Sequence, residues 1–239
     1  SLNLDGNSDF VSLPADFMAA VNKGSVTVSF WVNMVQNDAN NSQIAFSMFG
    51  QSTENHFSIN YHKHFTEWRN NLRTGNVSKT AAYDIPGSSN ADGSGYGLGW
   101  EHFVGVFEVS DGAYRSELYR NGVSVDVEEG TSGQSDFIGD IARIHIGASA
   151  NAEGGNAFTD GQLDQFAFWN VALSPQVVAE IYNGGVMRDL TTSGGQYYRS
   201  DVVDELIGYY QFEGNALDSS GNGFHGTLNG TAGFSQNQP

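Results

Sequence analysis

The sequence predicts an all-β fold, a two-sheet antiparallel jelly-roll sandwich with one short α-helix near residues 174–183. Apolar and polar residues alternate with a period of two in many short segments, such as Val26–Val32 and Leu163–Trp169. This alternation is typical of strands that bury one face. Gly, Asn, Asp and Ser separate the segments at short intervals, and many short strands joined by such turns favour a sandwich.

The predicted elements follow in chain order. A weak helical turn is expected over Ala15–Val21, ahead of the strand at Val26–Val32. Asn121-Gly122 lies between two alternating runs and predicts a two-residue hairpin, because both residues tolerate positive φ. Further strands are expected at Ile44–Phe49, Phe103–Val109, Glu117–Tyr119 and Arg143–Ile146.

The helix is predicted from its ends and its apolar face. Ser174 suits the N-cap, Pro175 suits the first helical position, and Gly184 is expected to end the helix. The buried face is expected to carry Val177, Val178 and Ile181.

Length and charge bound the class of protein. The chain has 239 residues, with 10 Lys+Arg against 27 Asp+Glu, so its formal net charge is −17. So acidic a chain argues against nucleic-acid binding, which requires clustered cations.

The absence of Cys excludes a disulfide framework and thiol catalysis. No stretch of 18 apolar residues is present, so no membrane insertion is expected. We expect a single domain over residues 1–239.

Acidic, Asn-rich loops suggest a cation. Asp5–Asp9, Asp160–Asp164 and Asp218–Gly223 offer side-chain oxygens at close spacing, and Ca²⁺ takes 6–8 oxygen ligands. The alternative for any one loop is that Asp, Asn and Gly simply form turns. Two long glycine-containing loops, Gly87–Gly99 and Ala148–Gly161, are candidates for ligand binding.

Catalytic motifs are weak. Glu128 and Glu129 are adjacent, so on a strand they point to opposite faces, and no paired-carboxylate motif of a glycoside hydrolase is present. His62-x-His64 would share a strand face and suit a transition metal, or form a solvated pair. We therefore expect a protein that is not an enzyme.

Aromatic residues divide into two groups. Trp31, Trp100 and Trp169 lie in apolar strand contexts and are expected in the core. Trp68 and Tyr96 lie among polar or glycine residues, where each can stack on a ligand or pack at an edge.

Three segments together resemble the laminin-G-like, pentraxin-like jelly-roll domains of the concanavalin-A-like lectin/glucanase superfamily. They are Leu2–Val11 followed by Val26–Val32, Trp100–Phe107 followed by Glu117–Val123, and Gly161–Asn170 followed by Ala172–Pro175. The resemblance covers residues 1 to about 185. Residues 206–234 match a motif that often precedes this domain, and here they are expected to supply a closing strand.

The resemblance implies calcium. A structural Ca²⁺ is expected near Asp5 and Asp164, and a ligand-binding Ca²⁺ is expected between the loops at Ser52–Asn55 and Asn151–Asn156. The second loop has fewer carboxylates than pentraxins have. The expected metal ligands are Asp5, Asp164, Asn55, Glu153 and Asp160, and the expected ligand-binding residues are Glu54, Asn55, Asp92, Tyr96, Asn151, Glu153 and Asn156.

The function expected from this resemblance is calcium-dependent binding of a carbohydrate or peptide, without catalysis. The setting would be a secreted or cell-surface bacterial adhesin that mediates attachment through a glycan or peptide on another cell or protein. Flanking domains of a larger chain are expected. The alternatives are a divergent polysaccharide hydrolase or lyase of the same superfamily, and a structural spacer.

Overall fold

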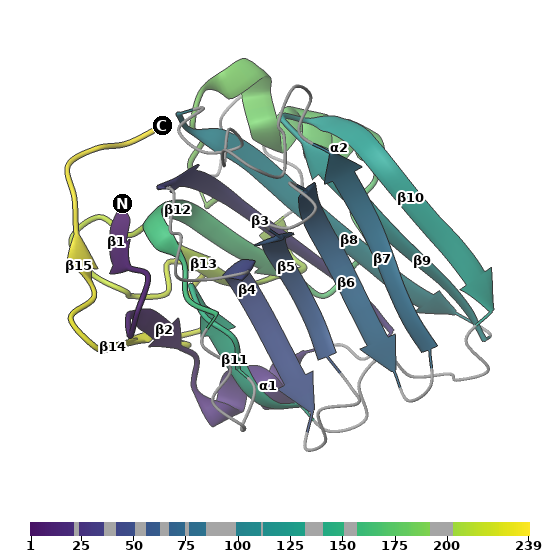
Figure 1. Ribbon diagram of the computed structural model, residues 1–239, viewed down its shortest axis with the longest axis horizontal. Coiled ribbons are helices and arrows are strands. Elements are labelled where there is room, and N and C mark those ends of the chain that lie inside the picture. The colour runs from purple at the N-terminus through teal and green to yellow at the C-terminus, as the bar shows by residue number, and fades with distance from the viewer. Residues whose placement is uncertain are drawn as a thin grey trace.

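The computed structural model describes most of the chain, and all structural statements concern that part. The described residues are 1–21, 24–35, 42–50, 56–62, 67–74, 77–84, 99–110, 112–131, 141–150, 157–191 and 203–239. Within them the chain forms two antiparallel β-sheets packed face to face (Figure 1). The predicted all-β sandwich is therefore confirmed.

The first sheet, sheet A, contains eight of the described strands. In spatial order they are β10 (Val123–Thr131), β9 (Ala113–Arg120), β8 (Glu101–Ser110), β3 (Ser25–Met34), β12 (Asp160–Trp169), β1 (Leu2–Asp5) and β15 (Gly233–Phe234), with β13 (Leu206–Tyr210) also paired to β12.

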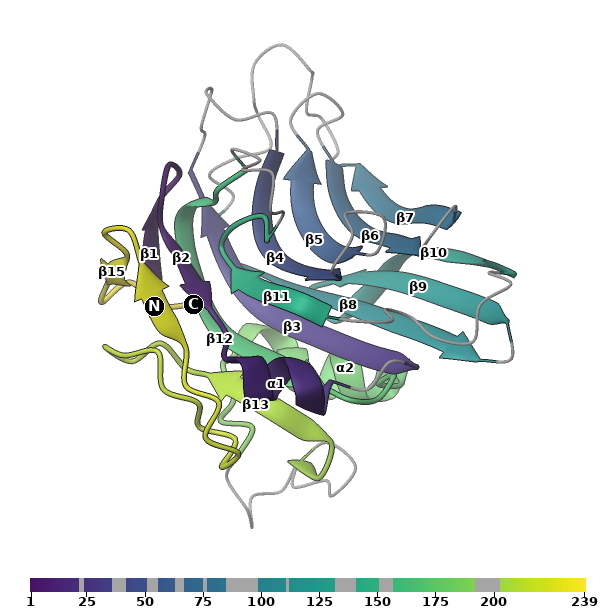
Figure 2. The same cartoon turned by 90° about the horizontal axis from the view of Figure 1, so that it is seen from below.

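The second sheet, sheet B, contains seven described strands. In spatial order they are β14 (Thr227–Asn229), β2 (Phe10–Ser12), β11 (Ile141–Ile146), β4 (Ser42–Gly50), β5 (His56–His62), β6 (Glu67–Thr74) and β7 (Val77–Asp84). The strands β4 to β7 run as a continuous antiparallel series (Figure 2).

Aromatic rings fill the space between the sheets. Phe30 on sheet A stacks on Phe166 at a centroid distance of 6.0 Å. Trp68, from sheet B, stacks on Phe103 of sheet A at 4.2 Å and is 3% exposed. Trp68 is thus a core residue and offers no surface for a sugar ring. Each such buried ring contributes about 1.5–3 kcal/mol to stability.

The helix α2 (Pro175–Tyr182) forms where the sequence predicts it. The Ser174 hydroxyl oxygen accepts from the Val177 N–H at 3.4 Å, so Ser174 is the N-cap. The helix ends at Asn183, which adopts the left-handed conformation (φ 51°), one residue before the expected Gly184. The short turn η1 (Asn183–Gly185) follows it, and a second helix, α1 (Ala15–Ala20), forms at the predicted weak turn.

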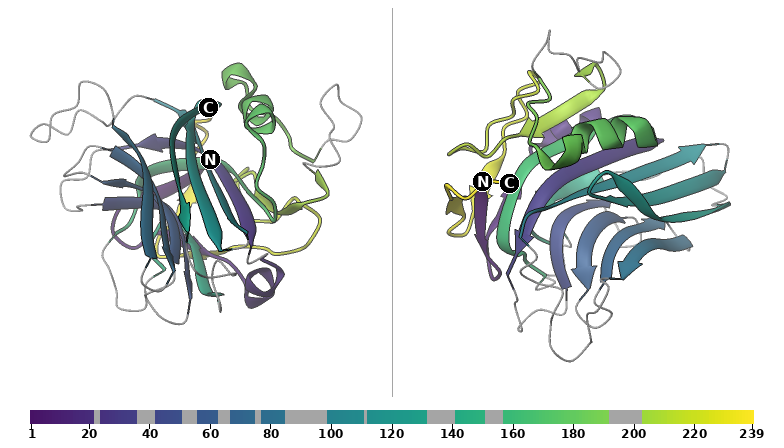
Figure 3. Two further views of the ribbon diagram at one scale, coloured as in Figure 1. Left: turned by 90° about the vertical axis from the view of Figure 1, so that its right-hand side faces the viewer. Right: turned by 90° about the horizontal axis from the view of Figure 1, so that it is seen from above.

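Figure 3 shows the resulting layers: sheet B, then sheet A, then α2 on the outer face of sheet A.

The two positive φ angles of the Asn121-Gly122 turn, 49° and 77°, confirm the predicted hairpin between β9 and β10. Among the described residues, no helix is both long enough and apolar enough to cross a lipid bilayer.

The C-terminal segment takes part in both sheets. β13 pairs with β12, β14 pairs with β2, and β15 pairs with β1. The main chains of Ser1 and Ser235 exchange hydrogen bonds of 3.1 and 2.9 Å, which places the two marked ends close together (Figure 2). Residues 206–234 therefore pack as an integral part of the sandwich.

Polar contacts join the edge strands β7 and β10 on one side of the sandwich. The carboxylate of Asp126, on β10, accepts from the main-chain N–H of Ala82, on β7, at 2.8 Å. The ammonium of Lys79 lies 3.1 Å from the carboxylate of Glu128. These contacts satisfy part of the hydrogen-bonding capacity that edge strands otherwise present to solvent.

Candidate functional site

The two sheets differ in what covers their outer faces. On sheet A, Val106, Tyr119 and Trp169 pack beneath Val177 and Ile181 of α2, and all are buried. The part of the outer face of sheet A beneath α2 is therefore an interior surface. The outer face of sheet B lies on the side away from α2 and is the candidate binding surface (Figure 3).

Alternation along the strands decides which side chains lie on that face. On β5, Phe57, Ile59 and Tyr61 belong to the core between the sheets, and on β6 Trp68 does. Because successive side chains point to opposite faces, the residues between them point outward. We call this set the polar face: Arg143 and His145 on β11, Ser47 and Phe49 on β4, His56, Ser58, Asn60 and His62 on β5, Glu67, Arg69, Asn71 and Arg73 on β6, and Ser78 and Thr80 on β7.

One row of the polar face carries cationic and ring side chains. Arg143 lies opposite Phe49, Phe49 opposite His56, and His56 opposite Arg73. The rings of Phe49 and His56 stack with centroids 4.9 Å apart and 18° between their planes. Phe49 is buried, whereas Arg143, His56 and Arg73 are partly exposed.

The next row carries short hydrogen-bonding side chains. Ser47 lies opposite Ser58, Ser58 opposite Asn71, and Asn71 opposite Thr80. The Thr80 hydroxyl donates to the Asn71 side-chain oxygen at 3.0 Å, and the Asn71 amide donates to the side-chain oxygen of Asn60. Ser47, Ser58 and Asn60 are buried, so the accessible part of this row lies on β6 and β7.

The segment after β11 is bound to the polar face. The Ser47 hydroxyl donates to the carbonyl of Ala148 and accepts from the N–H of Ala150, both at 2.7 Å. The Arg143 guanidinium donates to the carbonyl of Ala150 at 2.7 Å. Residues 148–150 are thereby fixed beside Arg143.

The ligand-binding residues predicted from the sequence lie outside the described residues: Glu54, Asn55, Asp92, Tyr96, Asn151, Glu153 and Asn156. The described residues next to two of these loops lie close together in sheet B. Gly50 and His56 border the loop of Glu54 and Asn55, and Ala150 precedes the loop of Asn151. Gly50 and Phe49 pair with β11, on which Arg143 contacts Ala150.

The carboxylate of Asp5 stabilises the loop that follows it. One carboxylate oxygen accepts from the N–H groups of Asn7, Ser8 and Asp9, at 2.9, 3.0 and 3.2 Å. Burial raises the pKa of Asp5, but the hydrogen bonds from Ser8, Asn7 and Asp9 outweigh it and hold the pKa below its usual value. This loop follows the alternative interpretation, in which the acidic residue organises a turn.

Asp218, near the other end of the chain, likewise organises its loop by accepting hydrogen bonds from the main chain. Its carboxylate accepts from the N–H groups of Tyr209 and Phe224, each at 3.0 Å, and of Ser220 at 2.9 Å. These charge-assisted hydrogen bonds stabilise the carboxylate of Asp218.

The strand register separates the two aspartates that the resemblance placed at one structural calcium. Asp5 lies opposite Asp160, whereas Asp164 lies four residues farther along β12, roughly 13 Å away. One ion therefore cannot contact both Asp5 and Asp164, which corrects that expectation. Among the described residues, no group of three His, Asp or Glu side chains is placed to hold a metal ion.

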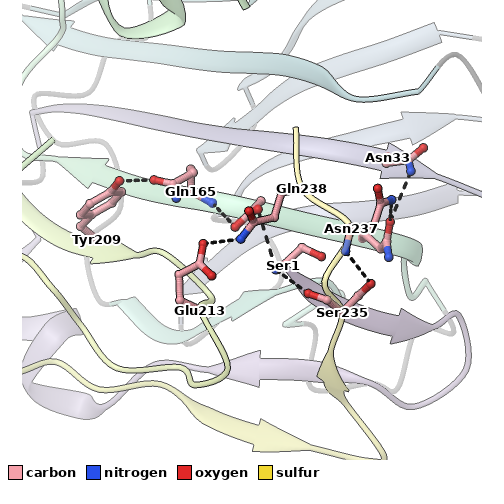
Figure 4. Close-up of polar contacts among 10 residues, drawn as sticks. Ser1, Asn33, Gln165, Tyr209, Glu213, Ser235, Asn237 and Gln238 are labelled. Carbon is pink, nitrogen blue, oxygen red and sulfur yellow. Dashed lines mark hydrogen bonds and ion pairs between the residues drawn. The ribbon is translucent and has the colours of Figure 1, made fainter. Parts of the chain in front are cut away.

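Asp164 occupies a buried polar cluster. Its side chain is fully buried, one oxygen accepts from the Gln165 N–H at 3.0 Å, and the other lies 3.8 Å from the amino group of Ser1. Burial raises the pKa of Asp164 to about 6, although the Ser1 amino group lowers it. Figure 4 shows the surrounding contacts, in which Tyr209 donates to Gln165 and Gln238 donates to Glu213.

Sequence reasoning missed most of the polar face, because β5, β6 and β7 were not predicted. On β6 and β7 the inward pattern itself is irregular. Their inward positions include Asn70 and Lys79, so the apolar alternation that reveals a strand is interrupted. The available signal was Trp68, an aromatic at the centre of a polar run, which marks the inward side of β6.

Comparison with solved structures shows the same fold at low sequence identity. A Bacteroides ovatus protein assigned to carbohydrate binding has a TM-score of 0.61 and 14% identity, covering 99% of this chain and 61% of that one. A heptameric SAP-like pentraxin from Limulus polyphemus has a TM-score of 0.54 and 17% identity, covering 76% and 80%. The NanB sialidase of Streptococcus pneumoniae has a TM-score of 0.58 and 20% identity, covering 83% of this chain and 30% of the enzyme.

These identities support the shared fold and no more. No curated protein matches the chain. A family model does match, that of the Laminin_G_3 family, described as the concanavalin A-like lectin/glucanases superfamily, over residues 5–179. The match spans most of the chain, including every strand of both sheets from β2 to β12, and it agrees with the resemblance seen in the sequence. The chain therefore belongs to the laminin-G branch of the concanavalin A-like lectin/glucanases superfamily.

Proposed function

We propose that this protein is a non-catalytic glycan-binding domain and that it binds its ligand on the polar face of sheet B. The observation that carries the proposal is the contrast between the two outer faces. Part of the outer face of sheet A packs beneath α2, whereas the polar face has hydrogen-bonding side chains on five neighbouring strands.

The chemistry of the accessible part suits sugar hydroxyls. Asn71, Ser78 and Thr80 supply donors and acceptors on β6 and β7, and Arg73 supplies further donors. The partly exposed ring of His56 offers a flat surface for the C–H groups of a sugar. Ligand sites of this kind combine a few placed polar groups with a ring surface.

Two of the similar solved structures support a glycan as the ligand. One is assigned to carbohydrate binding and the other is a sialidase. Because their identities are low, they support the class of ligand and no individual contact.

Binding without cleavage is proposed because glycoside hydrolysis requires two carboxylates about 5–9.5 Å apart. Among the side chains that the structure describes, Glu67 is the carboxylate on the polar face, and it is ion-paired with Arg69. The strand register places Asp84 opposite Glu67, so turnover of a glycan is an outcome that the test below must measure.

The calcium and the biological setting are proposed from the family resemblance. Calcium would be held by the loops that contain Asn55 and Glu153, whose flanking residues meet beside Arg143. We further propose a secreted or cell-surface adhesin as the setting, with attachment to glycans of another cell. A peptide ligand is the outcome that would replace the glycan.

The test is binding of the purified domain to an array of glycans and free C-terminal peptides, with calcium and after chelation. The double variant Asn71→Ala/Thr80→Val removes two groups from the polar face, and Asn237→Ala, remote from that face, is the matched control. We expect glycan binding that falls about tenfold in the double variant and is unchanged in the control. Binding to peptides alone, turnover of a glycan, or unchanged binding by the double variant would contradict the proposal.

A further inference from the structure

Arg143 differs in its partners from four other cations of the described chain. Arg69 pairs with Glu67, Arg115 with Glu117 and Glu129, Arg120 with Glu101, and Lys79 with Glu128. In the described part of the chain, Arg143 instead donates to a neutral main-chain carbonyl, that of Ala150, and faces no carboxylate. A guanidinium that faces no described carboxylate is unexpected in a chain of net charge −17.

Arg143 is partly exposed, and one of its guanidinium nitrogens is already bonded. Its Nε atom makes the bond to Ala150, so the two terminal nitrogens retain donors. A guanidinium presents its donors in a planar fork, which fits the two oxygens of a carboxylate or a sulfate. Partial burial strengthens such an interaction because it lowers the local dielectric constant.

The charge of Arg143 acts on its neighbour. His145 lies two residues along the same strand, on the same face, and its ring is 4.4 Å from the ring of Phe10. Burial is the main reason that the pKa of His145 is lowered, and the positive charge of Arg143 lowers it further. The field at this corner of the polar face is therefore positive.

Two more arginines lie on the polar face. Arg73 lies in the same row as Arg143, three strand spacings away, or about 14 Å. Arg69 lies four residues from Arg73 on β6 and shares its face. Arg69 is ion-paired with Glu67, and the register places Asp84 opposite Glu67 on the same face.

We infer that the polar face selects acidic glycans and that Arg143 is the residue that binds their carboxylate or sulfate group. This inference rests on the proposed function and narrows its ligand to a class. Neutral hydroxyls would be bound by the side chains of β6 and β7, and the acidic group would add a charge-assisted pair of hydrogen bonds at β11.

The experiment compares glycans in matched pairs, each acidic member having a neutral counterpart with the same backbone: sialyllactose and sulfated lactose against lactose, and dextran sulfate against dextran. Binding is measured for the wild type, Arg143→Gln, Arg143→Lys and Arg115→Gln. The last variant removes one positive charge from the outer face of sheet A, so it controls for net charge.

We expect acidic members to bind at least about tenfold more tightly than their neutral partners. Arg143→Gln should abolish that preference while neutral binding persists, Arg143→Lys should retain part of it, and Arg115→Gln should retain all of it. The preference should also weaken from 50 to 500 mM salt, since it is electrostatic.

The outcomes separate the two proposals. Equal binding of neutral and acidic partners, or a preference that survives in Arg143→Gln, overturns this inference and leaves the glycan-binding proposal standing. An equal loss of preference in Arg115→Gln also overturns it, because the effect would then come from net charge. Failure to bind any member of the pairs or of the wider glycan array overturns both.

Discussion

The side-chain amide of Asn70, on β6, donates to the main-chain carbonyl of Glu117, on β9, at 3.1 Å across the interior of the sandwich. It also reaches the hydroxyl of Ser116 at 3.1 Å, and Asn70 is fully buried. This contact fixes the register of β6 against sheet A. Since a slip of one residue would turn every side chain of β6 to the other face, Asn70 determines that Arg69, Asn71 and Arg73 point outward.

The variant Asn70→Ala should lower the free energy of unfolding by about 2 kcal/mol, because it leaves buried acceptors on β9 without a donor. Urea unfolding monitored by tryptophan fluorescence measures this. The control is Ser78→Ala, at an exposed position on the neighbouring strand β7, which we expect to change stability by less than about 0.5 kcal/mol. Equal effects of the two variants would contradict this role.

His102 should make the fold sensitive to acid. It is fully buried, its Nε2 atom lies 2.8 Å from the hydroxyl of Ser29, and burial lowers its pKa from 6.5 to about 3. The unfolded chain takes up a proton at about pH 6.5, while the folded chain does not until about pH 3. Stability is therefore fully present above pH 6.5 and falls by about 1.4 kcal/mol for each pH unit below it.

Thermal unfolding between pH 4 and 8 measures this dependence. The variant His102→Asn keeps a polar partner for Ser29 and removes the titrating ring, so its stability should vary less with pH over that interval. A wild type and a variant with parallel pH profiles would show that another group is responsible.

The positive charge of Arg143 should be detectable through the pKa of His145. Burial is the larger cause of the lowered pKa of His145, and the charge of Arg143 adds to it. Replacing Arg143 with Gln should therefore raise the pKa of His145, while burial keeps it below 6.5. NMR titration of the histidine ring signals measures the shift. Arg115→Gln should leave the pKa of His145 unchanged, and an unchanged value in Arg143→Gln would show that the arginine does not act there.

Calcium, if bound in the predicted loops, should stabilise the fold. We expect chelation to lower the melting temperature of the wild type, and the double variant Asn55→Ala/Glu153→Ala to lose this response. Asp218→Asn is the control, because its carboxylate is held by three main-chain N–H groups. It should lower the melting temperature equally with and without calcium. A wild type indifferent to chelation would remove calcium from the proposal.

Prediction from sequence succeeded where the signal was local. The strands at Val26–Val32 and Leu163–Trp169 and the helix beginning at Pro175 lie within three residues of their observed bounds. Each of these segments has a regular apolar pattern or a recognisable cap. The prediction was wrong for a calcium shared by Asp5 and Asp164, because their separation depends on how β1 pairs with β12.

The sequence by itself determined the fold class, since alternation, turn residues and helix caps are properties of neighbouring residues. Only the tertiary structure decided that Asp5 and Asp218 bind main-chain N–H groups, and that Arg143 faces a carbonyl instead of a carboxylate. Arg143 and Phe49 are far apart in the chain and meet through the register of β11 with β4. Such a register is set by packing across the whole sandwich, so the chemistry of the polar face arises only when the sheets assemble.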